Sequence, residues 1–495
     1  MSGRTDRACR VAPPQGFTPS PDRQREHHRV TTDAIAGPAA VPRGATGRLL
    51  RRAEPYAPAA LLFVAYAVLS LSRNRRMEAL SWDLGIFEQA VRAYAHLQAP
   101  VVDLKGPGAD ILGDHFSPVI ALLAPLYRLF PGPATLLVAQ AALFALSSVP
   151  VTRAATRLLG RARGLSLGAA YGLGWGIQRA VDFEFHEICF AVPLLAFALE
   201  ALLARRPRAA LLWGLPLLLV KEDLGLTLAV VALLVARQAR RTDRRAALAG
   251  VATAALAVLV AALLFTVVIP AFGNGYAYWE KVGGASPTAG LATKLDTLAW
   301  VLVPTTGLLA LRSPLLLVAL PTLGWRFLSG DDHYWSTDWH YSAVLMPIVA
   351  LALVDALDTS ARSTRPWLRA YALQLPGAVL AVALALSATT LPLERLGHAS
   401  TYTTPAHVTE ADRLLARIPD GVSVEADIPP LSRLTSRCRV YWIGSAKGVL
   451  PAFVALDTSS GPAGDDPVAY AVRLHPGARF GVLGEAGGIT VLQRL

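Results

Sequence analysis

The chain has 495 residues, of which 53% are hydrophobic and 17% charged, and its mean hydropathy is +0.42. Long apolar runs rich in Leu, Ala and Val recur along it, which is typical of a polytopic membrane protein. The net charge of +12 does not indicate nucleic-acid binding, because most arginines flank apolar runs, where membrane topology accounts for them. Three cysteines without CxxC spacing support neither a disulfide framework nor a cysteine metal site.

The N-terminal segment, residues 1–50, is rich in Arg, Pro, Thr and Gly and lacks apolar periodicity. This composition predicts a basic, disordered cytosolic tail or a start codon assigned too far upstream. The first apolar run, 58–71, follows Arg51 and Arg52 and has no small-residue cleavage site, so we expect it to remain as a membrane anchor. By the positive-inside rule the N-terminus is cytoplasmic, and the next stretch, SWDLGIFEQA (81–90), emerges on the outer face.

The second apolar run, 116–130, decides the rest of the topology. It has only about 15 residues against the roughly 20 that a spanning helix needs, and Pro118 and Pro125 interrupt it. If it crossed the membrane, the arginines at 153–163 would lie outside, against the positive-inside rule. We therefore predict an interfacial or re-entrant helix here.

With that choice, about eleven membrane-spanning helices follow. Their ranges are 58–71, 134–152, 164–180, 188–203, 209–220, 224–236, 246–270, 298–311, 313–328, 341–358 and 371–389. The arginine clusters at 153–163, 205–208, 237–245 and 362–369 then all face the cytoplasm. The sequence thus predicts an all-α polytopic membrane domain over 51–389, with outer loops at 73–133, 181–187, 271–297 and 329–341.

The C-terminal part, residues 390–495, loses the membrane composition. Apolar and polar residues alternate in VSVEADI and FGVLGEAGGITVLQ, between Pro and Gly turns. A helix is expected over 407–418, with Gly421 just beyond its end. We predict a small soluble α/β domain on the extracytoplasmic side.

Unusual polar residues are concentrated in five segments, all on the predicted outer face. These segments are SWDLGIFEQA, LGDHFSP (112–118), VDFEFHEI (181–188), VKEDLG (220–225) and SGDDHYWSTDWHY (329–341). The cytoplasmic connections carry little besides arginine. Such a concentration of acidic residues, His, Lys and Trp at one membrane face predicts a site in an outer cavity.

Each of these features also has a simpler interpretation. Asp83 and Glu88 could solvate an amphipathic interfacial helix. Trp82, Trp335 and Trp339 could belong to the aromatic belt. Lys221 could lie in a solvated turn or a salt bridge. The histidines near carboxylates leave two chemistries open: a zinc or manganese site, or a phosphate site with a carboxylate as acid or base. No fixed-spacing metal motif is present. The candidate metal ligands are Asp114, His115, Glu184, His186, Glu187, His333 and Asp338.

Several of these motifs occur together in one known family. WDLGIFEQA, GDHFSPVIALLAPLY, FEFHE, KEDLG and HYWSTDWHYSAVLMPI resemble, in this order, the bacterial membrane family labelled domain of unknown function 2079, over residues 57–480. That family is similar in architecture to the GT-C glycosyltransferases, polytopic enzymes that take a sugar from a polyprenyl-phosphate donor on the outer face of the plasma membrane.

The resemblance implies a GT-C-like fold and an acidic residue in the first outer loop as base or orienter for the acceptor. Asp83 stands in that place, and Glu88 would support it. The donor would be a membrane-embedded polyprenyl-phosphate sugar, and the acceptor an envelope glycan, lipid or protein. The residues expected to bind the substrate or its phosphate are Trp82, His115, His186, Lys221, Arg326 and His340. The competing classes are a lipid or solute transporter and a non-enzymatic envelope scaffold.

Overall fold

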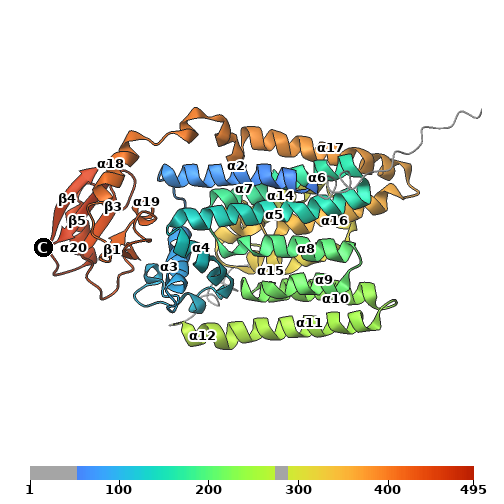
Figure 1. Cartoon of the computed structure of the whole chain (residues 1–495), viewed down its shortest axis with the longest axis horizontal. Coiled ribbons are helices and arrows are strands. Elements are labelled where there is room, and N and C mark those ends of the chain that lie inside the picture. Colours follow the sequence, from blue (N-terminus) through green and yellow to red (C-terminus); the bar gives the residue numbers. More distant parts are fainter. Residues whose placement is uncertain (1–52, 274–287) are drawn as a thin grey trace, which may run out of the picture. The chain divides into compact units, whose positions relative to one another are not determined.

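A computed structural model describes residues 53–273 and 288–495 (Figure 1). The predicted tail, 1–50, and most of the predicted outer loop 271–297 lie outside these ranges. The described chain is mostly helical with one small C-terminal sheet, which confirms the predicted class of a helical membrane protein.

Five helical stretches in the described ranges are long and apolar enough to cross a membrane. They are α2 (Tyr56–Arg75), α5 (Pro133–Leu159), α11 to α12 (Arg244–Phe272), the turn before α16 with α16 (His340–Ala361), and α17 (Pro366–Thr389). Shorter helices lie among them: α6 (Arg161–Gly172), α7 (Trp175–Asp182), α8 (Ala191–Leu203), α9 (Pro207–Gly214), α10 (Leu224–Ala239), α14 (Leu291–Thr306) and α15 (Leu320–Leu328). Within α11 to α12 the chain makes a π-helical turn at Leu264–Val268.

The run 116–130 forms two short pieces, η3 (Pro118–Leu123) and α4 (Ala124–Leu129), which pack against α3 (Asp83–Ala95). At 1.5 to 2 Å of rise per residue they are too short to cross a 30 Å hydrocarbon core on their own. The run 164–180, predicted as one helix, is instead broken into α6 and α7 at Leu173 and Gly174. Gln178 Nε2 donates to the Leu173 carbonyl at 2.7 Å, which satisfies a backbone group freed by the break.

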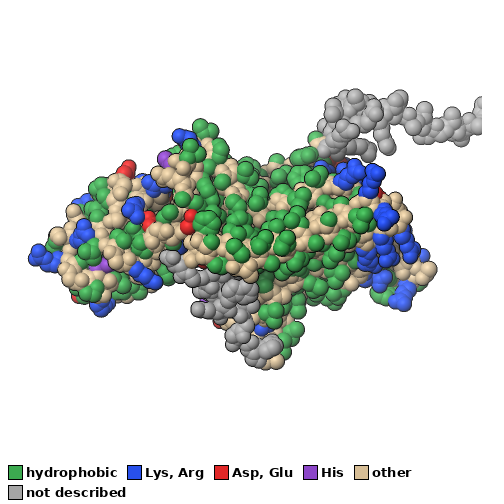
Figure 2. Space-filling model, turned by 90° about the horizontal axis from the view of Figure 1, so that it is seen from below, with side chains coloured by type: hydrophobic (Ala, Val, Ile, Leu, Met, Phe, Trp, Pro, Cys, Tyr) green, Lys and Arg blue, Asp and Glu red, His purple; other side chains and the backbone are tan. Residues whose placement is uncertain are grey.

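The arginines gather at one end of the helical bundle. Figure 2 shows Lys and Arg side chains crowded there, and in Figure 1 the connections α5–α6, α8–α9, α10–α11 and α16–α17 lie at this end. The buried carboxylate of Glu200 accepts ion pairs from Arg153, from Arg157 at 3.3 Å and from Arg206 at 3.7 Å. The C-terminal sheet lies at the other end of the bundle.

The C-terminal sheet has the strand order β2-β1-β3-β5-β4. Strands β1 (Ser423–Ala426), β2 (Arg439–Trp442) and β3 (Phe453–Asp457) are parallel, whereas β4 (Phe480–Ala486) and β5 (Ile489–Arg494) form an antiparallel hairpin. Helices α18 (Ala406–Leu415), α19 (Ile428–Leu431) and α20 (Pro467–Leu474) pack on it. The helix expected over 407–418 corresponds to α18.

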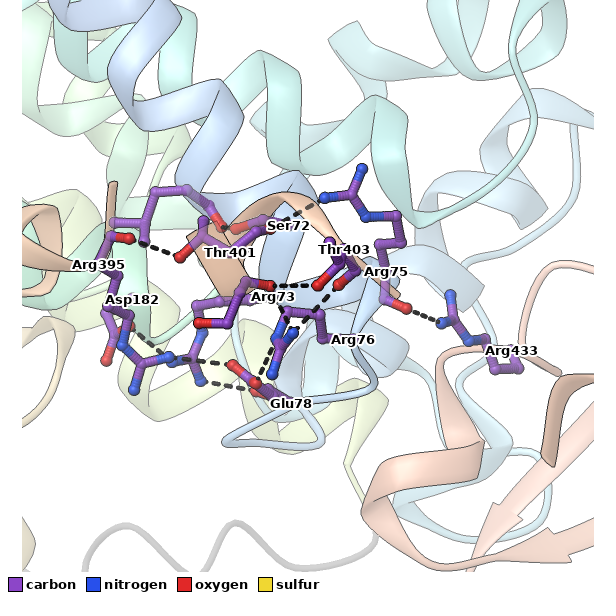
Figure 3. A network of polar contacts seen from close by, with 12 residues as sticks. Ser72, Arg73, Arg75, Arg76, Glu78, Asp182, Arg395, Thr401, Thr403 and Arg433 are labelled. Carbon is purple, nitrogen blue, oxygen red and sulfur yellow. Dashed lines mark hydrogen bonds and ion pairs between the residues drawn. The ribbon is translucent and has the colours of Figure 1, made fainter. Parts of the chain in front are cut away.

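A polar network fixes the connection from α17 to this sheet against the end of α2 (Figure 3). The connection contains η11 (Pro392–Gly397) and η12 (Ala399–Tyr402). Arg395 Nη1 contacts Glu78 Oε2 at 3.0 Å, and Arg75 Nη2 donates to the Thr401 carbonyl at 2.9 Å. Arg433 Nη2 in turn donates to the Arg75 carbonyl at 3.0 Å, so the C-terminal region is bound to the end of the first long helix.

Candidate functional site

The motif SWDLGIFEQA forms the entry to α3, which begins at Asp83. An acidic residue in the first turn is stabilised by the helix dipole. Phe87 packs edge-on against Phe185 at 5.6 Å and against the ring of His186 at 5.2 Å. The start of α3 is therefore held against the FEFHE segment.

A cavity of about 470 Å³ opens beside the start of α3. It is lined by Leu80, Ser81, Trp82, Asp83, Lys105, Asp114, His115, Phe183, His186, Lys221, Asp331, His333, Tyr334, Trp339, His340, Tyr341, Ile428 and Trp442. All five polar segments singled out in the sequence thus contribute to one cavity.

Two histidines form the centre of the cavity wall. The rings of His186 and His340 are stacked, with centroids 3.7 Å apart, and Phe183 covers His340 at 4.5 Å. Asp83, His186 and His340 offer ligand atoms that all lie within 4.8 Å of one another. Neither ring nitrogen of the buried His340 has a hydrogen-bond partner among the described residues. Buried polar atoms are rarely left unsatisfied, so this ring is suited to receive a ligand.

Lys221 lines the cavity, is 94% buried and forms an ion pair with Glu187. Its Nζ is 3.2 Å from Glu187 Oε1, while His186 Nδ1 is 2.6 Å from Glu187 Oε2. Burial alone would raise the pKa of Glu187, but His186 and Lys221 outweigh it and hold that pKa below its usual range. Glu187 lies behind the lining residues and orients two of them.

A second cation, Lys105, reaches the cavity from η1 (Asp103–Lys105). Its Nζ is 2.7 Å from Asp114 Oδ2 and 5.1 Å from the ring centroid of Trp82. Burial lowers the pKa of His115 to about 4, against a smaller opposing effect of Asp114. His115 is therefore a neutral imidazole at physiological pH.

Of the two predicted catalytic residues, Asp83 and Glu88, only Asp83 lines the cavity. Burial raises its pKa, and the nearby His186 and Lys105 partly offset this effect. Perturbed carboxyl groups of this kind cluster at functional sites.

Glu88, the other predicted catalytic residue, does not line the cavity. It is fully buried one and a half turns along α3, where Tyr127 donates to its Oε1 at 3.0 Å and Thr435 donates to its Oε2. Both of its oxygens are occupied by the protein, so this environment fits a structural role.

Arg326, predicted to bind phosphate, also lies away from the cavity lining. It is fully buried, and its guanidinium donates to the Tyr334 carbonyl at 2.8 Å, the Ser336 carbonyl at 2.8 Å and the Ser342 hydroxyl at 3.2 Å. These bonds hold the segment 329–341, which contributes Tyr334, His340 and Tyr341 to the cavity lining.

The predicted metal ligands are only partly brought together. Asp114, His115, His186 and His333 line the cavity, whereas Glu184, Glu187 and Asp338 do not. Glu184 is buried with a left-handed backbone, φ 85°, and Asp338 is exposed. His333 also forms a group with Asp331 and Asp332, in which His333 and Asp332 are exposed.

Sequence reasoning missed Lys105, Tyr334, Tyr341, Ile428 and Trp442. For Lys105 a signal exists: the chain has only five lysines among its 47 basic side chains, and two of the five line the cavity. The rarity of lysine in this arginine-rich chain therefore marks the loop of Lys105 as a candidate part of the site. No such signal marks the C-terminal residues.

The fold has a counterpart among solved structures. The crystal structure of ArnT from Cupriavidus metallidurans bound to undecaprenyl phosphate is similar with a TM-score of 0.52 at 16% identity, over 91% of this chain and 98% of that chain. The apo structure of the same protein gives a TM-score of 0.48 at 18% identity, over 88% and 97%. The first similarity confirms the GT-C-like fold expected from the sequence.

No curated protein matches the chain. The family model described as "Predicted membrane protein (DUF2079)" matches residues 73–448. This range contains all the residues that line the cavity, from Leu80 to Trp442. The chain therefore belongs to the DUF2079 family of predicted membrane proteins.

Proposed function

We propose that the chain is a membrane glycosyltransferase of the GT-C type, which transfers a sugar from a polyprenyl-phosphate donor to an envelope acceptor. The observation that carries the proposal is the cavity that joins Asp83 to Lys105, Lys221 and four histidines at one end of a helical bundle. The GT-C-like fold supports it. A cavity that holds carboxylates, two lysines and imidazoles suits a phosphate leaving group and a hydroxyl nucleophile.

The cavity in this proposal faces the outer side of the plasma membrane, and the helices cross about eleven times. The distribution of arginine supports this orientation, because the arginine-rich connections lie at the end of the bundle opposite to α3, whose first residue lines the cavity (Figure 1). The N-terminus is then cytoplasmic and the C-terminal sheet extracytoplasmic.

In the proposed reaction, Asp83 accepts the proton of the acceptor hydroxyl. The hydroxyl oxygen forms a bond to the anomeric carbon while the bond from that carbon to the phosphate oxygen breaks. Polyprenyl phosphate leaves with the electron pair, and a single displacement inverts the anomeric centre. Lys221 stabilises the negative charge on the phosphate, and neutral His115 can donate a hydrogen bond to it.

Asp83, His186 and His340 also support a second arrangement, in which they hold a divalent cation. Their ligand atoms lie within 4.8 Å of one another, and both ring nitrogens of His340 lack a hydrogen-bond partner within 53–273 and 288–495. One carboxylate and two imidazoles suit zinc or manganese. Such an ion would supply positive charge toward the phosphate, and Asp83 would then be a ligand and not the base.

Metal analysis separates the two arrangements. The purified protein is dialysed against EDTA, and its metal content and transfer activity are measured together. Activity that survives without stoichiometric metal supports Asp83 as the base. One bound metal per chain, lost together with activity and absent from His340→Ala but present in His333→Ala, assigns the three residues as ligands.

The function itself is tested in liposomes with undecaprenyl-phosphate-linked hexoses and pentoses. We expect the wild-type chain to consume the lipid-linked sugar and release undecaprenyl phosphate. Movement of the lipid between leaflets without cleavage of its glycosidic bond would identify a transporter. If the chain neither cleaves nor moves the lipid-linked sugar, the scaffold interpretation remains.

A further inference from the structure

The candidate site is not built by the helical bundle alone. Two of its lining residues, Ile428 and Trp442, come from the C-terminal sheet. Trp442 is the last residue of β2, and Ile428 follows β1, whose last residue Ala426 is paired with Trp442 in the parallel ladder. Open α/β sheets bind ligands outside the carboxyl ends of their parallel strands, and here that edge faces the cavity.

Trp442 lies next to Trp82 at the cavity wall. Their ring centroids are 4.5 Å apart with planes inclined at 46°, and both side chains are partly exposed. The Lys105 ammonium lies over the face of the Trp82 ring, 5.1 Å from its centroid. Two inclined aromatic rings with a cation beside them suit a ring that has an apolar C–H face and a hydroxyl edge, which is the shape of a pyranose.

The aromatic pair is held in place by contacts outside the cavity. Gln89 Nε2 donates to the Val440 carbonyl at 2.9 Å, two residues before Trp442, while Gln89 Oε1 accepts from the Leu104 amide at 3.2 Å. Ser445 donates to the Leu104 carbonyl at 3.3 Å. One side chain of α3 therefore ties the strand that carries Trp442 to the turn that carries Lys105, so the wall is formed before any ligand binds.

The chain order also relates this wall to the chemistry. Trp82 and Asp83 are consecutive at the start of α3, so a ring packed on Trp82 can place a hydroxyl near the Asp83 carboxylate. Lys221 and the stacked His186 and His340 line other parts of the same cavity. The cavity thus offers a cationic and imidazole wall for a phosphate and an aromatic wall for a sugar ring.

We propose that Trp82, Lys105, Ile428 and Trp442 form a carbohydrate-binding acceptor subsite, and that the C-terminal sheet is thereby part of the catalytic site. The acceptor is then a glycan or a glycosylated lipid. That this subsite binds the acceptor rests on the proposed function, whereas its binding of a sugar ring does not.

Saturation-transfer difference NMR on the full chain in lipid nanodiscs tests the binding. The probes are methyl α-glucopyranoside, methyl α-mannopyranoside and methyl β-galactopyranoside. We expect saturation of ring C–H protons for at least one probe with the wild type. Trp442→Leu, which keeps an apolar side chain without an aromatic face, is expected to weaken binding about fivefold, the factor that corresponds to ~1 kcal/mol for an aromatic contact.

Two control variants accompany this measurement. Trp442→Phe keeps an aromatic face and is expected to retain most of the signal, and Trp367→Leu removes an exposed tryptophan at the start of α17, 63% exposed, without effect. The inference is overturned if no probe is saturated by the wild type, or if Trp442→Leu, folded as judged by its thermal midpoint, binds the probes as the wild type does.

A second readout distinguishes this inference from the proposed function. With undecaprenyl-phosphate-linked sugars as donors and the probe as acceptor, Trp442→Leu is expected to raise the KM for the probe about fivefold, whereas Trp367→Leu transfers to the probe as the wild type does. If the wild type cleaves no donor, the proposed function fails, and the NMR result alone decides whether the subsite binds a sugar. If Trp442→Leu transfers to the probe at the wild-type rate, the assignment of the acceptor subsite is wrong, but the proposed glycosyltransferase function is retained.

Discussion

The hydroxyl of Thr435 donates a hydrogen bond to Glu88 Oε2 across 347 positions of the chain. Tyr127 donates to the other oxygen at 3.0 Å. One buried carboxyl group thus joins α3, α4 and the segment after α19. Because α3 begins at Asp83, this junction sets the position of the cavity relative to the C-terminal sheet.

Stability is expected to fall as the pH rises through neutrality because of Glu88. Burial raises its pKa to about 7, although Thr435, Tyr127 and Arg92 oppose the shift. A raised folded-state pKa favours the protonated form, so this stability is complete below the unfolded value of 4.5 and is lost as the pH passes 7. The loss is on the order of 3 kcal/mol. Thermal midpoints of the detergent-solubilised protein from pH 4 to 8 measure it.

Glu88→Gln is the matched control, because it stays neutral and can still bond both hydroxyls. Its midpoint should change less with pH than that of the wild type. If both proteins show the same pH profile, other groups cause it and Glu88 is ionised in the folded state.

Asp83→Asn is expected to reduce sugar transfer by about 10²- to 10⁴-fold, the usual contribution of a positioned base. The expectation does not depend on whether Asp83 accepts a proton or holds an ion. Asp338→Asn, at an exposed position outside the cavity, should transfer at the wild-type rate. Release of undecaprenyl phosphate by the two purified variants is the measurement, and equal rates would remove Asp83 from the chemistry.

Gly85→Ala is expected to destabilise the contact between α3 and the C-terminal region. A Cβ atom at this position would lie 2.2 Å from Leu431 Cδ2 and 2.9 Å from Leu104 Cδ1, so both neighbours would have to move. Overpacking of this kind costs about 1–3 kcal/mol. Gly324→Ala, where nothing lies within 4 Å, should leave the thermal midpoint unchanged or raise it.

A double variant tests the cause. Adding Leu431→Ala to Gly85→Ala should recover part of the lost midpoint, because it removes the obstructing methyl groups. Independent, additive losses would show that the glycine is needed for another reason.

Arg326→Met is expected to loosen the segment 329–341. The carbonyl groups of Tyr334 and Ser336 would lose their donor, at a cost of about 1–3 kcal/mol each. Limited proteolysis should cut this segment faster than in the wild type or in Arg312→Met, which replaces an exposed arginine. Unchanged proteolysis together with a higher KM for the donor would favour the phosphate-binding role expected from the sequence.

Patterns that depend on one stretch of chain were readable from the sequence. The short, proline-interrupted run at 116–130 and the arginine clusters indicated where a helix could not cross, and the five polar segments indicated one cavity. Asp83, His186, Lys221 and His340 were selected in this way. Alternation and turn residues likewise identified the C-terminal strands.

What could not be predicted depends on contacts between distant segments. Nothing in DLGIFEQ distinguishes Asp83, which lines the cavity, from Glu88, which Thr435 and Tyr127 enclose. Arg326 reads as a cation near a polar loop, but its three acceptors appear only when the loop folds back on it. The place of Trp442 at the cavity follows from the docking of a whole sheet, which no local pattern specifies.

Glu88 is synthesised well before Thr435, so the hydrogen bond between them forms only late in translation. At about 10 residues per second, the ribosome needs roughly half a minute to synthesise the 347 positions that separate them. During that time Asp83 is already translated, while the strand that carries Trp442 has yet to emerge. A chain released early therefore lacks one wall of its cavity, and the proposed transfer to an acceptor begins only after nearly the whole protein has been translated.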